Sequence, residues 1–402
     1  MRMMISFAAL FASVALLQLS SGGVGPLDAL TGLAEGFSKA EVGFLGSAHF
    51  VGFFIGCWWA PRLMGEIGHS RAFATFTAMG AIGLAAHVVV TDPNWWALFR
   101  IASSVCVAGC YTVVEAWLQA KVTNENRGRA MASYRIADSG ASFIAQLMIG
   151  ALADMETYVA YNLLTILCCA SLLPLTLTRT PQPVTPKTTR LRPSLAWRCS
   201  PLAVAAVVVA AISAASFRMV GPIYGQEVGL GADQIGAFLA AFVAGGFVAQ
   251  YPLGWLADKF DRRYVLVALS IPSVLSSVVT VAVAGTGVTG VMIAAAFFGF
   301  TTFPIYSVAT AHAHDFATSE QRVELSAALM FFYATGAIAA PLVTSNLIEA
   351  FGPGALFYFI SIAHVILVLF SIGRMRVRSA PDERTAFVVA PRTSFLIGRL
   401  TR

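Results

Sequence analysis

The chain has 402 residues, of which 57% are hydrophobic and 11% are charged. An ordinary soluble domain is roughly 45–50% apolar and about 25% charged, so this composition excludes the soluble globular class. The apolar residues lie in runs of about 20, each long enough to cross a ~30 Å hydrocarbon core as a helix. Strands of a transmembrane barrel would instead alternate apolar and polar residues over about 10 positions. We therefore predict an all-α integral membrane protein.

Twelve apolar runs predict twelve transmembrane helices. They lie near residues 4–30, 41–63, 72–90, 95–119, 130–153, 158–177, 202–224, 234–256, 264–284, 289–311, 323–348 and 354–373. The first run, MMISFAALFASVALLQLSS, resembles a secretory signal peptide. It continues through GGVGPLDAL, however, and has a counterpart later in the chain, so we expect a retained helix.

The positions of Lys and Arg predict the orientation, because short loops that carry these residues stay in the cytoplasm. With the N-terminus inside, most of the 26 basic residues fall on the cytoplasmic side, and Lys39 is the periplasmic exception. We therefore predict that both termini are cytoplasmic. The formal net charge of +6 follows from this topology and does not indicate binding to nucleic acid.

The longest polar break separates six predicted helices from the next six. It reads RTPQPVTPKTTRLRPSLAWRCS, and it holds five positive charges and no acid, which is typical of a flexible linker. We predict an N-terminal six-helix bundle over residues 1–178, a cytoplasmic linker over 179–200, a C-terminal six-helix bundle over 201–373 and a basic cytoplasmic tail over 374–402.

The two predicted bundles repeat each other in sequence. The tripeptide VGP at 24–26 recurs at 220–222, and SGA from Ser139 matches TGA from Thr335. Between them, YTVVEAWLQAKVTNENR from Tyr111 aligns with YSVATAHAHDFATSEQR from Tyr306. Because each repeat has an even number of helices, both enter the membrane in the same direction, as parallel repeats related by an axis along the membrane normal.

Several of these motifs resemble those of a known family. GWLADKFDRR, Gly254–Arg263, is similar to the loop between the second and third helices of each half in the major facilitator superfamily. FRIASSVCVAG resembles its fourth-helix pattern, which begins with an intramembrane arginine, here Arg100. More narrowly, VVEAWL, RGRAMASY, QYPLGWLADKFDRR and PIYSVATAHAHD resemble a bacterial YcaD-like subgroup of transporters. The resemblance implies the major facilitator fold.

Five charges gather within residues 258–263 of this sparsely charged chain. One interpretation is a cytoplasmic latch, in which Gly254 allows close helix approach and Asp258 faces the positive N-terminus of a helix. The resemblance implies that this helix is the fifth, in the other half. Arg262 and Arg263 would then bind lipid headgroups or nearby acids. The alternative, that these charges only fix topology, leaves Asp258 unexplained.

Two arginines, Arg100 and Arg218, fall inside predicted helices at similar depth. Ionisable groups at membrane depth are costly and therefore indicate function or pairing. The resemblance implies that the first, fourth, seventh and tenth helices line a central cavity, where both arginines would attract an anionic or polar solute. The alternative is local neutralisation, for instance of Arg218 by Asp28 or Glu227. Further candidates for the cavity are Tyr224 and Tyr306.

A second intramembrane group comprises Glu115, Arg135 and Asp138. Glu115 and Arg135 lie at similar depth on consecutive predicted helices, so we expect an ion pair. Asp138, one turn beyond Arg135, could share that arginine. A carboxylate that competes for one arginine is a candidate proton carrier, because burial raises its pKa while the arginine lowers it. The alternative is a purely structural pair.

No motif predicts a cofactor, a metal or a catalytic centre. Most of the six cysteines lie inside apolar runs and none forms a CxxC pair, so we expect buried free thiols. His312 and His314 are two residues apart and do not share a helix face, which favours a helix terminus or a gate. His49, His87 and His364 are most simply packed neutral rings. The chain lacks a GxxxxGK[ST] loop, and no nucleophile has an evident base, so we expect no enzyme.

The sequence therefore predicts a secondary active transporter in the cytoplasmic membrane of a bacterium. We expect it to move a small organic solute by alternating access, coupled to protons, and to act as a monomer with membrane lipids as its other partners. Two alternatives remain open, a multidrug-type efflux protein and a non-transporting sensor with the same fold. The fifth predicted helix, DSGASFIAQLMIGALAD, lacks proline, which weighs against efflux.

Overall fold

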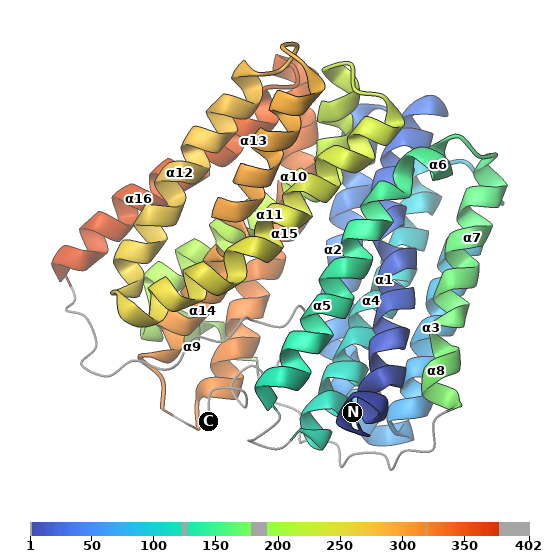
Figure 1. Cartoon of the computed structure of the whole chain (residues 1–402), viewed down its shortest axis with the longest axis horizontal. Coiled ribbons are helices and arrows are strands. Elements are labelled where there is room, and N and C mark those ends of the chain that lie inside the picture. The colour runs from blue at the N-terminus through green and yellow to red at the C-terminus, as the bar shows by residue number, and fades with distance from the viewer. Residues whose placement is uncertain (1, 123–126, 178–190, 319, 378–402) are drawn as a thin grey trace. The chain divides into compact units, whose positions relative to one another are not determined.

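A computed structural model describes residues 2–122, 127–177, 191–318 and 320–377 of the chain. In these residues the regular structure is helical (Figure 1). The chain divides into two compact units, Met1–Thr188 and Thr189–Arg402. Each unit is described by itself below.

The N-terminal unit contains eight described helical segments. They are α1 (Arg2–Ala34), α2 (Lys39–Ile67), α3 (His69–Ala86), α4 (Pro93–Lys121), α5 (Arg127–Leu147), α6 (Ile149–Ala153), α7 (Thr157–Ala170) and α8 (Leu172–Thr176). Local sequence sets where these helices begin. Ser38 and Glu41 form a capping box at the start of α2, and Asp92 accepts hydrogen bonds from the backbone N–H groups of the first turn of α4, which satisfies donors that have no partner within the helix.

The C-terminal unit contains eight more. They are α9 (Pro193–Cys199), α10 (Pro201–Glu227), α11 (Ala232–Lys259), α12 (Arg262–Ala282), α13 (Val288–Thr302), α14 (Ile305–His314), α15 (Arg322–Phe351) and α16 (Ala355–Val377). Ser200 caps α10 through the backbone N–H of Ala203, and Asp261 caps α12 through that of Arg263. Pro304 stands between α13 and α14, where its missing N–H interrupts the helical ladder.

The sequence repeat has a counterpart in the packing of each unit. Helix α1 packs against α5 and α2 against α4, just as α10 packs against α15 and α11 against α13. Glycines allow close packing of α2 on α4 and of α11 on α13. A methyl group on Gly52 would overlap the backbone carbonyl of Ile101, and one on Gly245 would overlap that of Ala296. Gly56 also lies close to α4, since a methyl group on it would overlap the backbone carbonyl of Val105.

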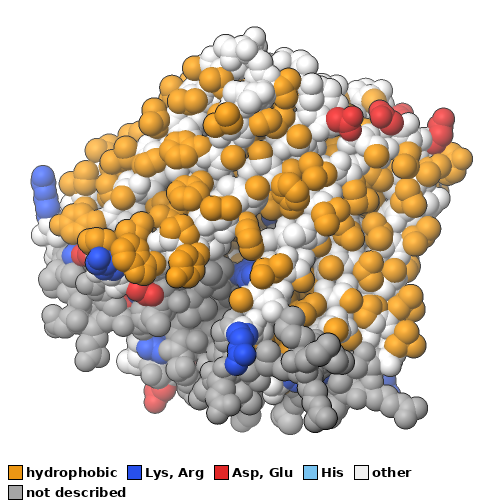
Figure 2. Space-filling model, viewed as in Figure 1, with side chains coloured by type: hydrophobic (Ala, Val, Ile, Leu, Met, Phe, Trp, Pro, Cys, Tyr) orange, Lys and Arg blue, Asp and Glu red, His pale blue; other side chains and the backbone are white. Residues whose placement is uncertain are grey.

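Ten helical stretches among the described residues are long and apolar enough to cross a membrane. Helices α3 and α5 are not among them, so the count of twelve spans and the cytoplasmic placement of both termini stay predictions. Figure 2 shows hydrophobic side chains spread over most of the described part of the visible face. That apolar surface suits a chain whose helices face lipid.

The predicted linker over residues 179–200 contains a helix near its end. Residues 178–190 lie outside the described residues, but α9 occupies the end of this range. Pro193 stands in its first turn, where a proline is tolerated, and Leu195, Ala196 and Cys199 are buried in the core of the C-terminal unit. The role of residues 179–200 as a cytoplasmic linker stays a prediction. The predicted tail also begins inside a helix, because α16 extends to Val377, and residues 378–402 lie outside the described part.

Candidate functional site

A buried ion pair joins α1 to α4 in the N-terminal unit. The Oδ2 atom of Asp28 lies 3.1 Å from Nε of Arg100, and both residues are only 2% exposed. Asp28 follows Pro26 in the second half of α1, and Arg100 lies in the second turn of α4. Removing either charge from a pair this far from solvent leaves the other charge buried and uncompensated, which is strongly destabilising.

Two more side chains complete the surroundings of this carboxylate. The hydroxyl of Tyr161, on α7, donates a 2.6 Å hydrogen bond to Oδ1 of Asp28. The ring of His87, just after α3, stacks on the ring of Tyr161 at 4.9 Å and places Nε2 3.8 Å from the same Oδ1 atom. Asp28 therefore has a permanent cation, a hydroxyl donor and a titratable ring around it.

This arrangement bears on both predicted arginines. The sequence offered Asp28 as a neutralising partner of Arg218, whereas the structure pairs it with Arg100, because α1 packs beside α4. Arg218 is half-buried on α10. A cavity shared by the two arginines would lie between the two units, and it stays a prediction.

The two tyrosine candidates lie in the C-terminal unit. Tyr224 is 1% exposed, its hydroxyl donates to the carbonyl of Thr280 at 3.1 Å, and its ring packs against Phe238 and Phe357. These are the contacts of a core residue. Tyr306 is half-buried and meets the ring of Tyr333 edge to face at 5.1 Å. Their assignment to a cavity remains a prediction.

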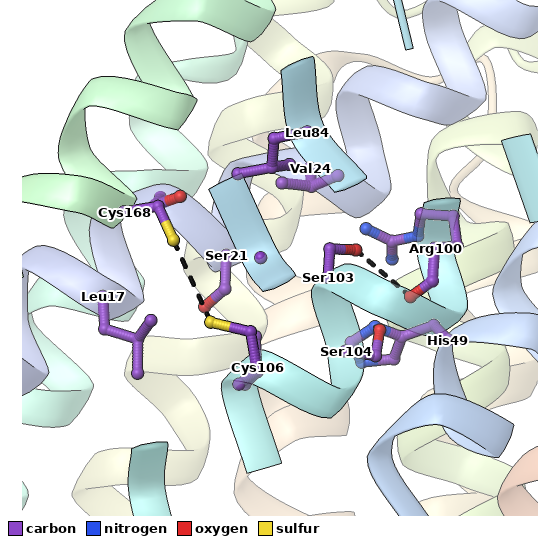
Figure 3. Close-up of a pocket in the computed structure, with 13 residues that line it drawn as sticks. Leu17, Ser21, Val24, His49, Leu84, Arg100, Ser103, Ser104, Cys106 and Cys168 are labelled. Carbon is purple, nitrogen blue, oxygen red and sulfur yellow. Dashed lines mark hydrogen bonds between the residues drawn. The ribbon is translucent and has the colours of Figure 1, made fainter. Parts of the chain in front are cut away.

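Arg100 also lines a small pocket within the N-terminal unit, shown in Figure 3. At one end of this pocket Arg100 lies near His49, whose Nδ1 atom is hydrogen-bonded to Ser104. At the other end the thiols of Cys106 and Cys168 lie 3.9 Å apart. The pocket thus combines one cationic, hydrogen-bonding end with one thiol-lined end.

A second buried carboxylate, Asp138, lies between α1, α4 and α5. It is fully buried, its Oδ1 atom accepts a 2.6 Å hydrogen bond from the hydroxyl of Tyr111, and its Oδ2 atom lies 3.9 Å from Nη1 of Arg135. The predicted contact between Arg135 and Asp138 is therefore present. The hydroxyl of Tyr111 also lies 2.5 Å from Oε1 of Gln18. One hydroxyl hydrogen cannot serve both oxygens, so Tyr111 donates to only one of them at a time.

Glu115 is buried on α4, one turn from Tyr111. Its Oε1 atom accepts a 3.1 Å hydrogen bond from the hydroxyl of Tyr134, on α5. The predicted ion pair between Glu115 and Arg135 stays a prediction. The contact with Tyr134 nevertheless joins the same two helices that the sequence paired.

The charged loop of the C-terminal unit is built around Arg262. This arginine is 1% exposed, and its Nη1 atom lies 2.5 Å from Oδ1 of Asp315, at the end of α14. It also donates to the backbone carbonyls of Ala257 and Ala311, and Oδ1 of Asp258 is 3.4 Å from Nη2. Arg262 thus contacts two acids, Asp315 and Asp258, and its predicted contact with lipid headgroups stays a prediction. Gly254, one turn before Asp258, is buried on α11.

Arg263 binds a different acid. Its Nη2 atom lies 2.6 Å from Oδ2 of Asp261, and its Nε atom bonds to both oxygens of that carboxylate. Partial burial works to raise the pKa of Asp261, but the hydrogen bonds from Arg263 outweigh it and hold that pKa below its usual value. The helix predicted to receive Asp258 lies in the other unit, so the latch between the units stays a prediction.

Sequence reasoning missed Tyr161 and gave His87 only a packing role. One signal was available, because Asp28, His87 and Arg100 all fall near the same predicted membrane face, although 72 residues separate Asp28 from Arg100. No group of three or more His, Cys, Asp or Glu side chains among the described residues is arranged to hold a metal ion.

Comparisons with known proteins agree with this architecture. The sequence profile described as Major Facilitator Superfamily matches residues 10–201 and again residues 202–400. The MFS-type transporter YcaD of Escherichia fergusonii is 28% identical over 348 residues, which is 85% of this chain and 88% of that protein. YcaD of Escherichia coli is 28% identical over 337 residues, 83% of this chain and 87% of that protein.

Three solved structures share the fold at low sequence identity. A variant of the nucleoside transporter NupG has a TM-score of 0.74 at 12% identity and covers 91% of this chain and 98% of its own. A D-xylose-proton symporter has a TM-score of 0.69 at 13% identity, covering 91% and 96%. A bacterial homologue of the lysosomal transporter Spinster, inward-facing and unoccupied, has a TM-score of 0.68 at 15% identity, covering 98% and 96%.

Proposed function

Because the chain belongs to the Major Facilitator Superfamily, we propose that it is a secondary active transporter that moves a small polar solute across the bacterial cytoplasmic membrane, coupled to protons. Alternating access of the two halves around a central site is the mechanism that this fold supports. The similarity to YcaD transporters supports the transport part of the proposal. The coupling part depends on the buried carboxylates.

The observation that carries the proposal is a chemical arrangement that occurs twice in the N-terminal unit. Asp28 has a guanidinium nitrogen at 3.1 Å and a tyrosine hydroxyl at 2.6 Å. Asp138 has a guanidinium nitrogen at 3.9 Å and a tyrosine hydroxyl at 2.6 Å. Both carboxylates are at most 2% exposed. Each can exist as a buried anion matched by its arginine or as a neutral acid.

Such a group can couple a proton to a movement of helices. Burial disfavours the charged carboxylate, whereas a nearby arginine favours it, so a change in the distance to the arginine changes the affinity for a proton. Asp28 and Arg100 lie on different helices. A proton that enters the surroundings of this pair therefore weakens the contact between α1 and α4, and a rearrangement of those helices releases the proton.

The polar end of the pocket supports a polar or anionic solute. Arg100, with its fork of donors, lies there beside His49 and Ser104. One of the structural neighbours is a nucleoside transporter and another is a D-xylose-proton symporter, and both names describe polar cargo.

The test works for a solute whose identity is open. Proteoliposomes that contain the purified protein are given an inward proton gradient and a bacterial metabolite extract, and mass spectrometry identifies the compounds that accumulate inside. We expect accumulation that collapses with a protonophore and falls at least tenfold in Asp28→Asn. The matched control is Asp154→Asn, which changes an exposed carboxylate and should accumulate like the wild type. Equal accumulation with and without the gradient would refute coupling.

A further inference from the structure

We propose that His87 binds the coupling proton and that this proton releases Arg100 from Asp28, which makes Arg100 available to an anionic cargo. The inference rests on the proposed function and adds to it a proton site and a substrate class. It starts from the hydrogen bonds of one ring.

The contacts of His87 fix which ring nitrogen carries hydrogen. Nδ1 lies 2.7 Å from the carbonyl oxygen of Gly83, and a carbonyl can only accept, so Nδ1 carries the hydrogen. In a neutral ring Nε2 then presents a lone pair. That atom is buried without a hydrogen-bond partner in the described structure, and it lies 3.8 Å from Oδ1 of Asp28. A proton on Nε2 turns this contact between two acceptors into an attractive ion pair.

The groups packed around His87 come from three other helices. Asp28 faces it from α1, Trp96, Phe99 and Arg100 from α4, and Tyr161 from α7. His87 and Tyr161 are fully buried and the other polar groups nearly so. Asp28 is thus the carboxylate that faces the ring, and Arg100 is the cation that competes for it.

Charge counting gives the consequence of protonation. With a neutral ring, the anion Asp28 and the cation Arg100 sum to zero. A proton on His87 leaves two cations around one carboxylate, and Oδ1 of that carboxylate already accepts from Tyr161. One carboxylate cannot compensate two buried cations, so the cluster gains an uncompensated positive charge.

An anion at the pocket resolves this excess. Arg100 lines the pocket together with His49 and Ser104, and in this conformation the pocket has room for about one water molecule. A carboxylate or similar monoanion that enters once the pocket widens would pair with Arg100 while Asp28 pairs with protonated His87. By linkage, the proton strengthens anion binding by the same factor as the anion strengthens proton binding. The expected result is symport of one proton with one monoanion.

The decisive measurement is nitrogen-15 NMR of the purified full-length protein, labelled at histidine, between pH 5 and pH 8. His87→Gln assigns the signal. We expect the wild-type ring to become doubly protonated within this range. In Arg100→Gln, which removes the competing cation, proton affinity should rise at least tenfold, and in Asp28→Asn the ring should stay neutral. His364 is the internal control, because its fully buried ring contacts the neutral hydroxyl of Ser213 at 2.9 Å, where His87 faces a carboxylate, and it should stay neutral throughout.

Each outcome bears on a separate claim. A His87 ring that stays neutral to pH 5 in the wild type overturns the proton site, and an unchanged affinity in Arg100→Gln overturns the competition. If the proteoliposomes accumulate only neutral compounds, the anionic cargo is refuted while proton-coupled transport survives. If His87 titrates as expected but no compound accumulates, the proposed transport function fails and the proton site stands.

Discussion

Replacing Asp315 with asparagine should destabilise the C-terminal unit far more than the same replacement at Asp258. Both carboxylates contact the guanidinium of Arg262, at 2.5 Å and 3.4 Å. Their surroundings differ, because the Asp315 side chain is 1% exposed and that of Asp258 is 51% exposed. Arg262 itself is held in place by the carbonyls of Ala257 and Ala311, so it cannot turn toward water after its partner is lost.

The magnitudes follow from this difference in burial. Removing one partner of a buried ion pair leaves an uncompensated charge and costs about 3–5 kcal/mol, whereas an exposed pair contributes about 0–1 kcal/mol. A unit of this size loses about 2–4 °C in Tm for each kcal/mol. We therefore expect Asp315→Asn to lower the Tm by roughly 6–20 °C, and Asp258→Asn to lower it by less than about 4 °C.

The assay is thermal unfolding of the purified protein in detergent, followed by tryptophan fluorescence. The double variant Arg262→Met with Asp315→Leu should recover most of the loss, because an apolar pair of similar volume can replace a buried ion pair at little cost. Equal losses for Asp315→Asn and Asp258→Asn would show that burial does not govern this contact. Failure of the double variant to recover would show that Arg262 contributes chiefly through its carbonyl contacts.

Three further predictions concern other parts of the chain. Gly52→Ala should prevent close packing of α2 on α4 and lower the free energy of unfolding by about 1–3 kcal/mol or more. Gly140→Ala, with open space around it, should leave that free energy unchanged or raise it by up to about 1 kcal/mol. Thermal unfolding of both variants checks this. The lowered pKa of Asp261 means that its bonds to Arg263 stabilise the fold above pH ~4, and that this stabilisation is lost as the pH falls through the folded-state pKa. In Asp261→Asn the dependence of Tm on pH should therefore be flatter between pH 5 and pH 2. An unchanged dependence would contradict this. Asp138→Asn should lose proton-driven accumulation but keep counterflow, and full proton-driven uptake in this variant would remove Asp138 from coupling.

Apolar periodicity predicted the helices well, since each predicted span contains helix in the described structure. A run of about 20 apolar residues in lipid forms a helix, because every backbone N–H and C=O must find a hydrogen-bond partner within the membrane. Local interruptions were harder to see. The sequence did not reveal α9, whose buried residues Leu195, Ala196 and Cys199 are too few to stand out against the prolines and charges around them.

Pairing among buried ionisable groups was only partly predictable. The contact of Arg135 with Asp138 lies within one helix turn, so spacing alone predicted it. The partner of Arg100 lies on another helix, and composition offers no rule for choosing among distant acids. The depth of each group in the membrane narrowed the possible partners of Arg100 to acids near the same membrane face. Only the packing of α1 beside α4 assigned Asp28 to Arg100.

The repeat itself shows where the chemistry of this chain is concentrated. Two residues after the shared Val-Gly-Pro, the first half has Asp28 and the second has Tyr224, whose hydroxyl is used within the core. The shared Gly-Ala shows the same difference, an acid in the first half and none in the second. Asp138 precedes Ser139 in the first half, and Ala334 precedes Thr335 in the second. The two halves thus keep the same helix pairings but not the same buried acids.

In the C-terminal unit, hydrogen bonds between neutral side chains take the place of such acids. Ser216 bonds to Thr344 at 2.8 Å and Ser213 to His364 at 2.9 Å, and neither contact needs an ion. The buried acid Asp315 belongs to the loop cluster around Arg262, at the ends of α12 and α14. A transporter built this way needs only one half to change charge during its cycle. If the coupling proposal is right, neutralising Asp28 abolishes coupling, whereas Tyr224→Phe, which removes a single hydroxyl, leaves it intact and costs only the stability of one buried hydrogen bond, about 1 kcal/mol.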